Sequence, residues 1–197
     1  MHFKNLTFLS LLSLSSALFA QDGIYVEGGL GSGFNTSLNL QNTEYTYDRG
    51  LLGSVSLGYQ YDLFRFEVEG KYRQNDINSA SYNDSSSIKV EGLVKQISPM
   101  INAYYSSGYT EKNLASTIGF GVGTTSLTLS DIKELGISQN DISETLFSMQ
   151  AMFSADYKID DNLEFIAKYT YFYTFKSGTI SNNSDNIFSF NLRYSFK

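Results

Sequence analysis

Apolar and polar residues alternate along most of this chain with a period of two. The stretch FRFEVEGKYR, residues 64–73, has aromatic or aliphatic side chains at nearly every second position and charged side chains between them. The last stretch, residues 187–197, alternates as regularly, with Phe188, Phe190 and Phe196 on its apolar side. Successive side chains of a β-strand point to opposite faces, so each stretch predicts a strand with one apolar and one polar face.

Segments of this kind fill the chain after its first twenty residues. The eight predicted strands are residues 23–34, 51–61, 64–73, 88–105, 114–129, 145–159, 163–175 and 187–197. In the fourth segment the alternation slips near Leu93 and Val94, which predicts a β-bulge. The connections are tight or medium at 62–63, 106–113 and 160–162, and longer at 35–50, 75–87, 130–143 and 177–185. Antiparallel neighbours joined in this order place the long loops at one end of a barrel and the short turns at the other.

One long connection carries a helix signal. Asp131 is expected to cap a single helical turn, Glu134 to complete its capping box and Gly136 to end it.

Aromatic residues decide between a soluble barrel with an apolar interior and a membrane barrel with an apolar exterior. They gather toward both ends of the predicted strands, as in the girdles at the two surfaces of a bilayer. The group toward the short turns comprises Tyr25, Tyr59, Tyr61, Phe64, Tyr104, Tyr105, Tyr157, Phe165, Tyr194 and Phe196, and the group toward the loops comprises Phe34, Tyr72, Phe147, Tyr171, Tyr173, Phe175 and Phe188. The interior of an eight-stranded barrel is only just wide enough for side chains, so it suits the glycines and serines of the polar face better than rings. The sequence therefore predicts an all-β fold: a closed, antiparallel, eight-stranded up-and-down transmembrane β-barrel.

The polar face of this barrel contributes charges of both signs to the interior. The expected network comprises Glu27, Arg65, Glu67, Glu69, Lys71, Arg73, Glu164, Lys168 and Arg193, with Lys95, Asp156 and Lys158 as further candidates. An unpaired charge is costly in a low-dielectric lumen, so these side chains are expected to form salt bridges with a structural role.

The first twenty residues are typical of a cleavable signal peptide. Lys4 supplies the positive start, residues 6–19 the apolar stretch, and Ala20 a small residue at the cut site, with Ala17 as the alternative. Residues 21–197 then form one barrel domain. Loss of Lys4 moves the formal charge from -6 to -7, and the sole histidine, His2, leaves with the signal.

Little in the mature sequence points to catalysis or to a cofactor. There is no cysteine, so thiol chemistry, disulfides and lipid attachment to cysteine are excluded, and metal binding has neither cysteine nor mature histidine to use. Glu67 and Glu69 share a strand face, as an acid–base pair would, but the basic residues flanking them favour salt bridges. The cluster at 160–162 could contact calcium, although a plain turn explains it better. The glycines at 28–33 precede no helix and form no nucleotide loop.

The segments GIYVEGGLGSGF (23–34), IGFGVGTT (118–125) and NLRYSFK (191–197) resemble the small eight-stranded outer-membrane barrels, a group that includes opacity-type adhesins and the membrane domain of OmpA-like proteins. The resemblance covers the whole mature chain and implies a bacterial outer-membrane location, with periplasmic termini and extracellular long loops. It also implies recognition by the barrel-assembly machinery through a terminal aromatic residue; here Phe196 is followed by Lys197. Enzymes of similar architecture use a histidine base, which the mature chain lacks.

Three classes of function remain open. The first is a structural or surface-interaction protein, adhesin-like, that displays its loops to the environment or to lipopolysaccharide. The second is a narrow, porin-like channel for small ions or solutes, and the third is a soluble periplasmic carrier with an apolar cavity. The first predicts a monomer surrounded by outer-membrane lipid and lipopolysaccharide, with no cofactor. The acidic balance gives no footprint for nucleic acid.

Overall fold

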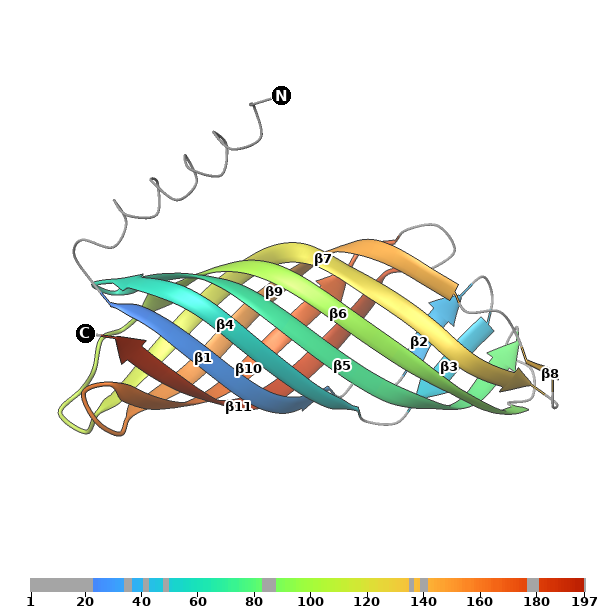
Figure 1. The fold of residues 1–197 in the computed structure, drawn as a ribbon, viewed down its shortest axis with the longest axis horizontal. Helices are drawn as coiled ribbons and strands as arrows, with labels where there is room; N and C mark the ends of the chain where they lie inside the picture. Colours follow the sequence, from blue (N-terminus) through green and yellow to red (C-terminus); the bar gives the residue numbers. More distant parts are fainter. Residues whose placement is uncertain are drawn as a thin grey trace, which may run out of the picture.

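The computed structural model describes residues 23–33, 37–40, 43–47, 50–82, 88–134, 137–138, 142–176 and 181–196. The signal-peptide prediction falls outside these residues. Eight long strands make the wall: β1 (Ile24–Gly33), β4 (Leu51–Tyr61), β5 (Phe64–Tyr82), β6 (Ile88–Ser106), β7 (Leu114–Glu134), β9 (Ile142–Lys158), β10 (Leu163–Thr174) and β11 (Asn183–Phe196). Each pairs antiparallel with its neighbours in this order, and β1 pairs with β11 (Figure 1). The sheet is therefore a closed eight-stranded barrel, as predicted.

The first and last long strands close the wall along their full shared length. Their register runs from Ile24 opposite Phe196 to Gly33 opposite Ile187. No edge of the eight-stranded wall is left unpaired at this seam, which is what a structure surrounded by lipid requires. The short turns and the C-terminal end of β11 lie together at one end of the barrel, on the left of Figure 1.

The other end is built from more strand than the sequence predicts. β5 continues to Tyr82 and β7 to Glu134, where 75–87 and 130–143 were expected to be loops. β2 (Ser37–Leu40) and β3 (Thr43–Tyr47) form a hairpin that pairs with β5, and β8 (Ile137–Ser138) pairs with the end of β7. Half of the wall therefore rises beyond the other half, on the right of Figure 1.

The predicted helical turn is wrong. Asp131 and Glu134 lie in β7, where Lys133 pairs with both Glu91 and Ser138, so the backbone there hydrogen-bonds to neighbouring strands. Gly136 lies outside the described residues. The predicted bulge is confirmed, because the β6–β7 register shifts between Glu91 and Leu93.

The two faces of the wall are oriented as the alternation predicts. Phe66, Phe153 and Phe190 are 52–64% exposed on the outside, whereas Arg65 of β5 and Arg193 of β11 point inward and are 3% and 1% exposed. The interior is polar and the exterior apolar, which excludes the soluble carrier with an apolar cavity. Within the described part of the chain, no helix has the length and apolar character needed to cross a bilayer.

The exposed apolar side chains form a band that starts at the short turns. The band ends at Leu30, Leu51, Tyr72, Ile97, Val122, Phe147 and Phe188, one from each of seven strands. Beyond it polar residues take outward positions, such as Gln74 and Asp76 on β5 and Thr124 on β7. A band with one sharp polar border matches the outward face of a transmembrane barrel.

Candidate functional site in the barrel lumen

The structure places all nine predicted interior charges inside the barrel, each no more than 9% exposed: Glu27, Arg65, Glu67, Glu69, Lys71, Arg73, Glu164, Lys168 and Arg193. They come from β1, β5, β10 and β11, at the positions that alternate with the lipid-facing residues. Because polar residues occupy every second position of these strands, charges from distant parts of the sequence meet in one lumen.

Arg193 is the centre of the network near the short turns. Its Nη2 atom lies 2.7 Å from Glu27 Oε2, and its Nη1 atom lies 2.7 Å from Glu164 Oε2 and 3.7 Å from Asp156 Oδ2. Glu27 also accepts a hydrogen bond of 2.7 Å from Lys168 Nζ. Charges buried this deeply are stable only when they are paired and hydrogen-bonded. Through these pairs Arg193 links its own strand, β11, to β1, β9 and β10.

Glu67 is held differently, by neutral donors. Its carboxylate accepts hydrogen bonds from the Tyr25 hydroxyl at 3.0 Å, the Tyr104 hydroxyl at 2.7 Å and Asn102 Nδ2 at 2.9 Å. The two rings also face cations, with the Arg193 guanidinium 4.9 Å from the Tyr25 ring centre. Hydrogen bonds from polar groups and ring faces therefore compensate the burial of this carboxylate and its cationic neighbours.

Two tyrosines of the predicted aromatic girdle belong to this network instead. Tyr25 is 0% exposed and Tyr104 is 5% exposed. Tyr104 precedes the outward Tyr105, and Tyr25 lies two positions before the inward Glu27, so strand parity directs both rings into the lumen. Parity is the signal that would have identified them, since two consecutive aromatic residues on a strand cannot both face lipid.

A second group of ion pairs lies nearer the loop end. Lys71 Nζ lies 3.4 Å from Glu69 Oε2 and hydrogen-bonds Gln150, while Gln150 Nε2 donates to Glu69 at 3.0 Å. Arg73 pairs with the buried Asp185 of β11. The sequence predicts a loop at Asp185, but β11 begins at Asn183 and so includes this residue.

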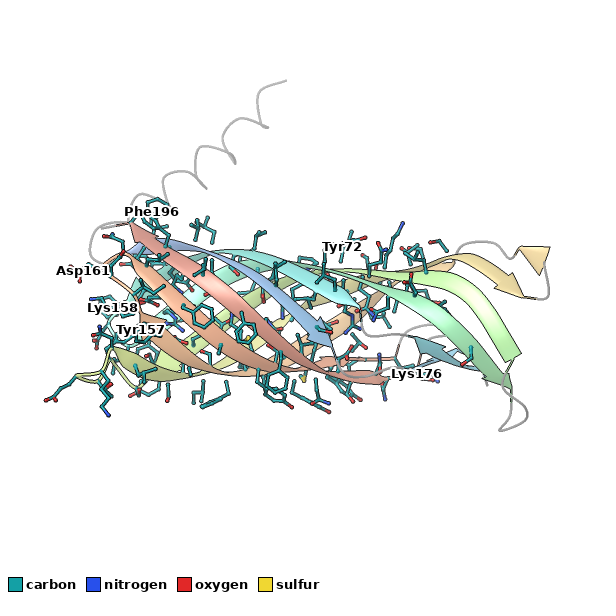
Figure 2. All side chains as sticks on the ribbon, turned by 90° about the horizontal axis from the view of Figure 1, so that it is seen from below. Tyr72, Tyr157, Lys158, Asp161, Lys176 and Phe196 are labelled. Carbon is teal, nitrogen blue, oxygen red and sulfur yellow. The ribbon has the colours of Figure 1, made fainter. Side chains whose placement is uncertain are left out.

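Two of the three further candidates do not face the lumen. Lys95 is exposed on the outer side of β6, beyond the border of the apolar band, where a polar outward residue is tolerated. Lys158 ends β9 at the short-turn mouth and pairs with Asp161 at 2.9 Å (Figure 2). Asp156 is fully buried and pairs with Arg65 at 3.1 Å.

An apolar cluster lies in the lumen beside Lys71 and Arg73 of the second group of charges. Leu52, Met100, Phe172 and Ile187 are buried together. Two cavities at this level, both lined by Arg73, Gln96 and Phe172, have volumes of about 10 Å³ each. Such a volume has room for about one water molecule, so the described lumen is packed at this level.

The inward glycines are required by this packing. A Cβ atom on Gly121 would lie 1.9 Å from Asn102 Oδ1 and 3.0 Å from Gln150 Cγ, whereas a Cβ atom on the outward Gly70 would meet nothing within 4 Å.

We expect Gly121→Ala to lower the free energy of unfolding by about 1–3 kcal/mol because it overpacks the lumen. Gly70→Ala is the matched control and should leave it unchanged or slightly raised. Urea unfolding in phospholipid vesicles measures both; equal effects would contradict the assigned faces.

Tyr109 lies in the connection between β6 and β7, at the short-turn end, and contacts Glu164 of β10. Burial, and then the negative charge and hydrogen bond of Glu164, raise the pKa of Tyr109 above its ordinary value of 10.0. The raised pKa means that this contact stabilises the fold below the usual tyrosine pKa and is lost as the pH rises through the folded value. An ultraviolet titration of tyrosinate, wild type minus Tyr109→Phe, should show one step later than that of exposed tyrosines. A step at the ordinary pH would show that the contact with Glu164 is not made.

The lumen offers no ready arrangement for metal chemistry. Among the described residues there is no group of three or more histidine, cysteine, aspartate or glutamate side chains placed to hold a metal ion. Glu67 and Glu69 lie on one face as predicted, and Asn102 Nδ2 donates to both at 2.9 Å. The pair is thus fixed by buried amide and hydroxyl groups.

Comparison with known proteins agrees with this architecture. Residues 6–196 match the family model described as the outer membrane protein β-barrel domain. Neisserial surface protein A is 17% identical over 88% of this chain and 97% of its own, with a TM-score of 0.64. The N-terminal barrel domain of Pseudomonas aeruginosa OprF is 14% identical (89% and 98% covered, TM-score 0.54). Yersinia pestis Ail, the attachment invasion locus protein, solved in complex with the heparin analogue sucrose octasulfate, is 14% identical (89% and 99%, TM-score 0.52).

No curated protein matched the chain by sequence. The structural similarities, all well below 25% identity, show a shared fold, whereas the family model covers nearly the whole chain. The resemblance to the small outer-membrane barrels is thereby confirmed, and the chain belongs to the outer membrane protein β-barrel domain family.

Proposed function

We propose that this protein is a closed outer-membrane scaffold that displays a sheet and loops at the cell surface for adhesin-like interactions. The observation that carries the proposal is the strand extension beyond the apolar band. β5 continues from Tyr72 to Tyr82 and β7 from Val122 to Glu134, and β5 pairs there with the β2–β3 hairpin. Just beyond the band the exposed side chains are polar at Gln74 and Asp76 of β5 and at Thr124 of β7. Strand that continues outside the bilayer adds nothing to membrane anchoring, so its use lies at the surface.

The orientation is part of the proposal. The short turns and the described end of β11 lie in the periplasm, and the extended strands are extracellular, as is usual for barrels with short turns at one end. During biogenesis the alternating Tyr194 and Phe196 near the C-terminus are the expected signal for the barrel-assembly machinery. In the mature state the partners are outer-membrane lipid, lipopolysaccharide and an unidentified surface ligand, and the barrel is a monomer.

The packed lumen supports a scaffold in preference to a channel. The apolar cluster around Phe172 and the ion pairs beside it leave two cavities of about 10 Å³ each. Planar-bilayer recordings of the purified protein should show no unitary conductance; regular single-channel steps would favour the porin-like alternative.

We also propose that the protein has no enzymatic activity, since Glu67 and Glu69 are held by buried hydrogen bonds away from solvent.

Surface display is tested on intact cells. One epitope tag is inserted in the 83–87 connection and a matched tag in the 107–113 turn. Antibody should stain the first in intact cells and the second only after the outer membrane is permeabilised. The opposite pattern would overturn the orientation.

Adhesion is tested separately by expressing the protein in a non-adherent bacterium, with and without Gly–Ser replacement of residues 83–87 and 135–141. The wild-type chain should make the bacterium bind host cells, and the replacement should reduce that binding. Equal binding by both chains would overturn the adhesin-like role.

A further inference from the structure

A belt of hydrogen-bonding side chains crosses the outer wall just beyond the apolar band. This polar belt comprises Gln74 on β5, Lys95 on β6, Ser126 and Thr128 on β7, and Ser143 and Thr145 on β9. We propose that it binds the phosphorylated sugar headgroup of one outer-leaflet glycolipid, whose acyl chain lies in an adjoining groove. The inference deepens the proposed function, which includes lipopolysaccharide without giving it a site, and it rests on the proposed orientation.

The strand register places most of the polar belt in one unbroken row. Gln74 lies opposite Lys95, Lys95 opposite Thr128, and Thr128 opposite Ser143. Side chains directly opposite each other on neighbouring strands have Cβ atoms about 5 Å apart, so the row is about 15 Å long. A row of this length can contact more than one sugar ring at once.

The β7–β9 part of the polar belt suits sugars. Ser126 Oγ lies 3.4 Å from Thr145 Oγ1, and Thr128 Oγ1 lies 3.4 Å from Ser143 Oγ. A hydroxyl can donate one hydrogen bond and accept two, so these long pairs leave donors and acceptors for a ligand. The outward residues of β7 and β9 at this level carry hydroxyls alone, so an anionic sugar meets no repulsion from them.

The β5–β6 part of the polar belt supplies an amide and a cation. The Tyr72 hydroxyl donates a hydrogen bond of 2.9 Å to Gln74 Oε1, so the Gln74 N–H groups can still donate to a ligand. Lys95 is exposed directly opposite, and no ion pair joins it to another residue of the described chain. The Gln74 amide and the Lys95 ammonium together therefore complement a phosphate.

Asp76 makes this part of the wall selective. It is exposed one outward position beyond Gln74, diagonally across from Lys95. Its carboxylate partly offsets the lysine charge toward a bare phosphate, and it accepts a hydrogen bond from a sugar hydroxyl. A headgroup with both a phosphate and hydroxyl donors therefore matches these three side chains better than a phosphate alone.

An apolar groove of about 440 Å³ adjoins the polar belt. Its lining includes Leu30, Leu51, Gly53 and Tyr72 of the apolar band, and Gln74 and Asp76 beyond it. A Cβ atom at Gly53 would come no closer than 4.0 Å to Leu30 Cδ2, so the packing of the wall does not require glycine here. Figure 2 shows Tyr72 projecting from the outer wall beside this hollow. Because Gln74 belongs to both the groove and the polar belt, one glycolipid can occupy the two at once.

Native mass spectrometry of the full detergent-solubilised chain tests the proposal. The probes are bisphosphorylated lipid A, the same glycolipid without its phosphates, and phosphatidylglycerol. We expect the wild type to retain one lipid A about tenfold more tightly than either other probe. Lys95→Gln should bring the two glycolipids to within about twofold of each other. Gly53→Leu fills the groove, and Ser126→Ala with Thr128→Val removes hydroxyls; each should weaken lipid A by about tenfold.

Two matched controls should behave as the wild type. Gly70→Leu adds the same side chain to the apolar band away from the groove, where a Cβ atom meets nothing within 4 Å. Lys112→Gln removes an exposed lysine from the 107–113 turn at the opposite end of the barrel. Each variant is first checked for the gel shift on heating that marks a folded barrel, and the wild-type comparison needs no variant.

Several results would overturn the glycolipid site. They are equal retention of the three probes by the wild type, the same loss in Gly70→Leu as in Gly53→Leu, or a protein dimer that Gly53→Leu abolishes, which would assign the groove to a second copy. Deacylated lipid A bound as tightly as lipid A would assign the polar belt to a soluble glycan instead. Surface-tag staining is independent of lipid retention, so a failed site leaves the proposed orientation standing, and inverted staining would fail that orientation separately.

Discussion

Replacing Arg193 with methionine should lower the free energy of unfolding by about 3–5 kcal/mol, because removing one partner of a buried ion pair leaves the others uncompensated. Arg193 contacts Glu27, Glu164 and Asp156, all within the low-dielectric lumen. Glu27 keeps Lys168 in the variant and Asp156 keeps Arg65, but Glu164 loses the one ion pair it makes among the described residues. Urea unfolding in vesicles, followed by tyrosine fluorescence and by the heat-dependent gel shift, gives the size of the effect.

Two further variants distinguish a lost charge from lost packing. Lys158→Met removes the solvent-exposed partner of Asp161 and should change nothing measurable. The double variant Arg193→Met with Glu164→Gln should recover part of the loss, because it removes a carboxylate that the single variant leaves unpaired. A single variant as stable as the wild type, or a double variant worse than the sum of its parts, would contradict the network as a stabilising device.

The second large effect concerns the lipid-facing side. Phe190 is 64% exposed on the apolar face of β11, one outward position inside the border residue Phe188. Phe190→Arg places a guanidinium in hydrocarbon and should cost about 1–4 kcal/mol, between the costs of arginine at the interface and at the midplane of a membrane barrel. Thr124→Arg adds the same side chain to the outer face of β7 just beyond the border, and should cost at most about 1 kcal/mol.

The comparison must be made in vesicles and repeated with the intact barrel in a soluble amphipol, where the hydrocarbon is less ordered. Equal costs for Phe190→Arg and Thr124→Arg in vesicles would mean that the apolar band does not mark the bilayer. If only Thr124→Arg lowered the free energy of unfolding, Thr124 would lie in the hydrocarbon and Phe190 outside it, which would contradict the assignment of the apolar band to the bilayer.

The sequence alone predicts the wall of this barrel well, for a physical reason. Inside a bilayer one face must be apolar and the lumen polar, so a strict period of two is imposed on every spanning strand. The alternation from Phe64 to Arg73 therefore assigns each side chain of this part of β5 to the face on which it lies. It also identifies the charges that meet in the lumen, although they are up to 166 residues apart in the chain.

Outside the bilayer the same constraint disappears, and prediction from the pattern fails with it. Residues 75–82 of β5 alternate poorly, yet they are strand, because β3 and β6 supply their hydrogen-bond partners. The same holds for Asp131 and Glu134 in β7, whose local sequence favours a capped helical turn. Non-local pairing overrides the local preference there.

The partners inside the lumen could not be read from the pattern either. Alternation says that Glu67 points inward, but not that Tyr25 of β1 and Tyr104 and Asn102 of β6 surround it. Those contacts depend on how each strand is staggered against the next. The stagger is set by the turns and by the bulge near Leu93, which the sequence locates without giving its effect on register.

In this barrel the outward side chains meet acyl chains and the inward side chains are sealed in the lumen. Nuclear Overhauser effects between lipid acyl protons and protein methyl groups, measured on the unaltered chain in lipid nanodiscs, test it without any substitution. The methyl groups of Val26, Val68 and Ile118, exposed on the outer wall, should show strong effects, and those of Leu52, Ile166 and Ile187, buried in the lumen, should show none. Strong effects from the second set, or from both sets alike, would contradict a closed barrel with a polar interior.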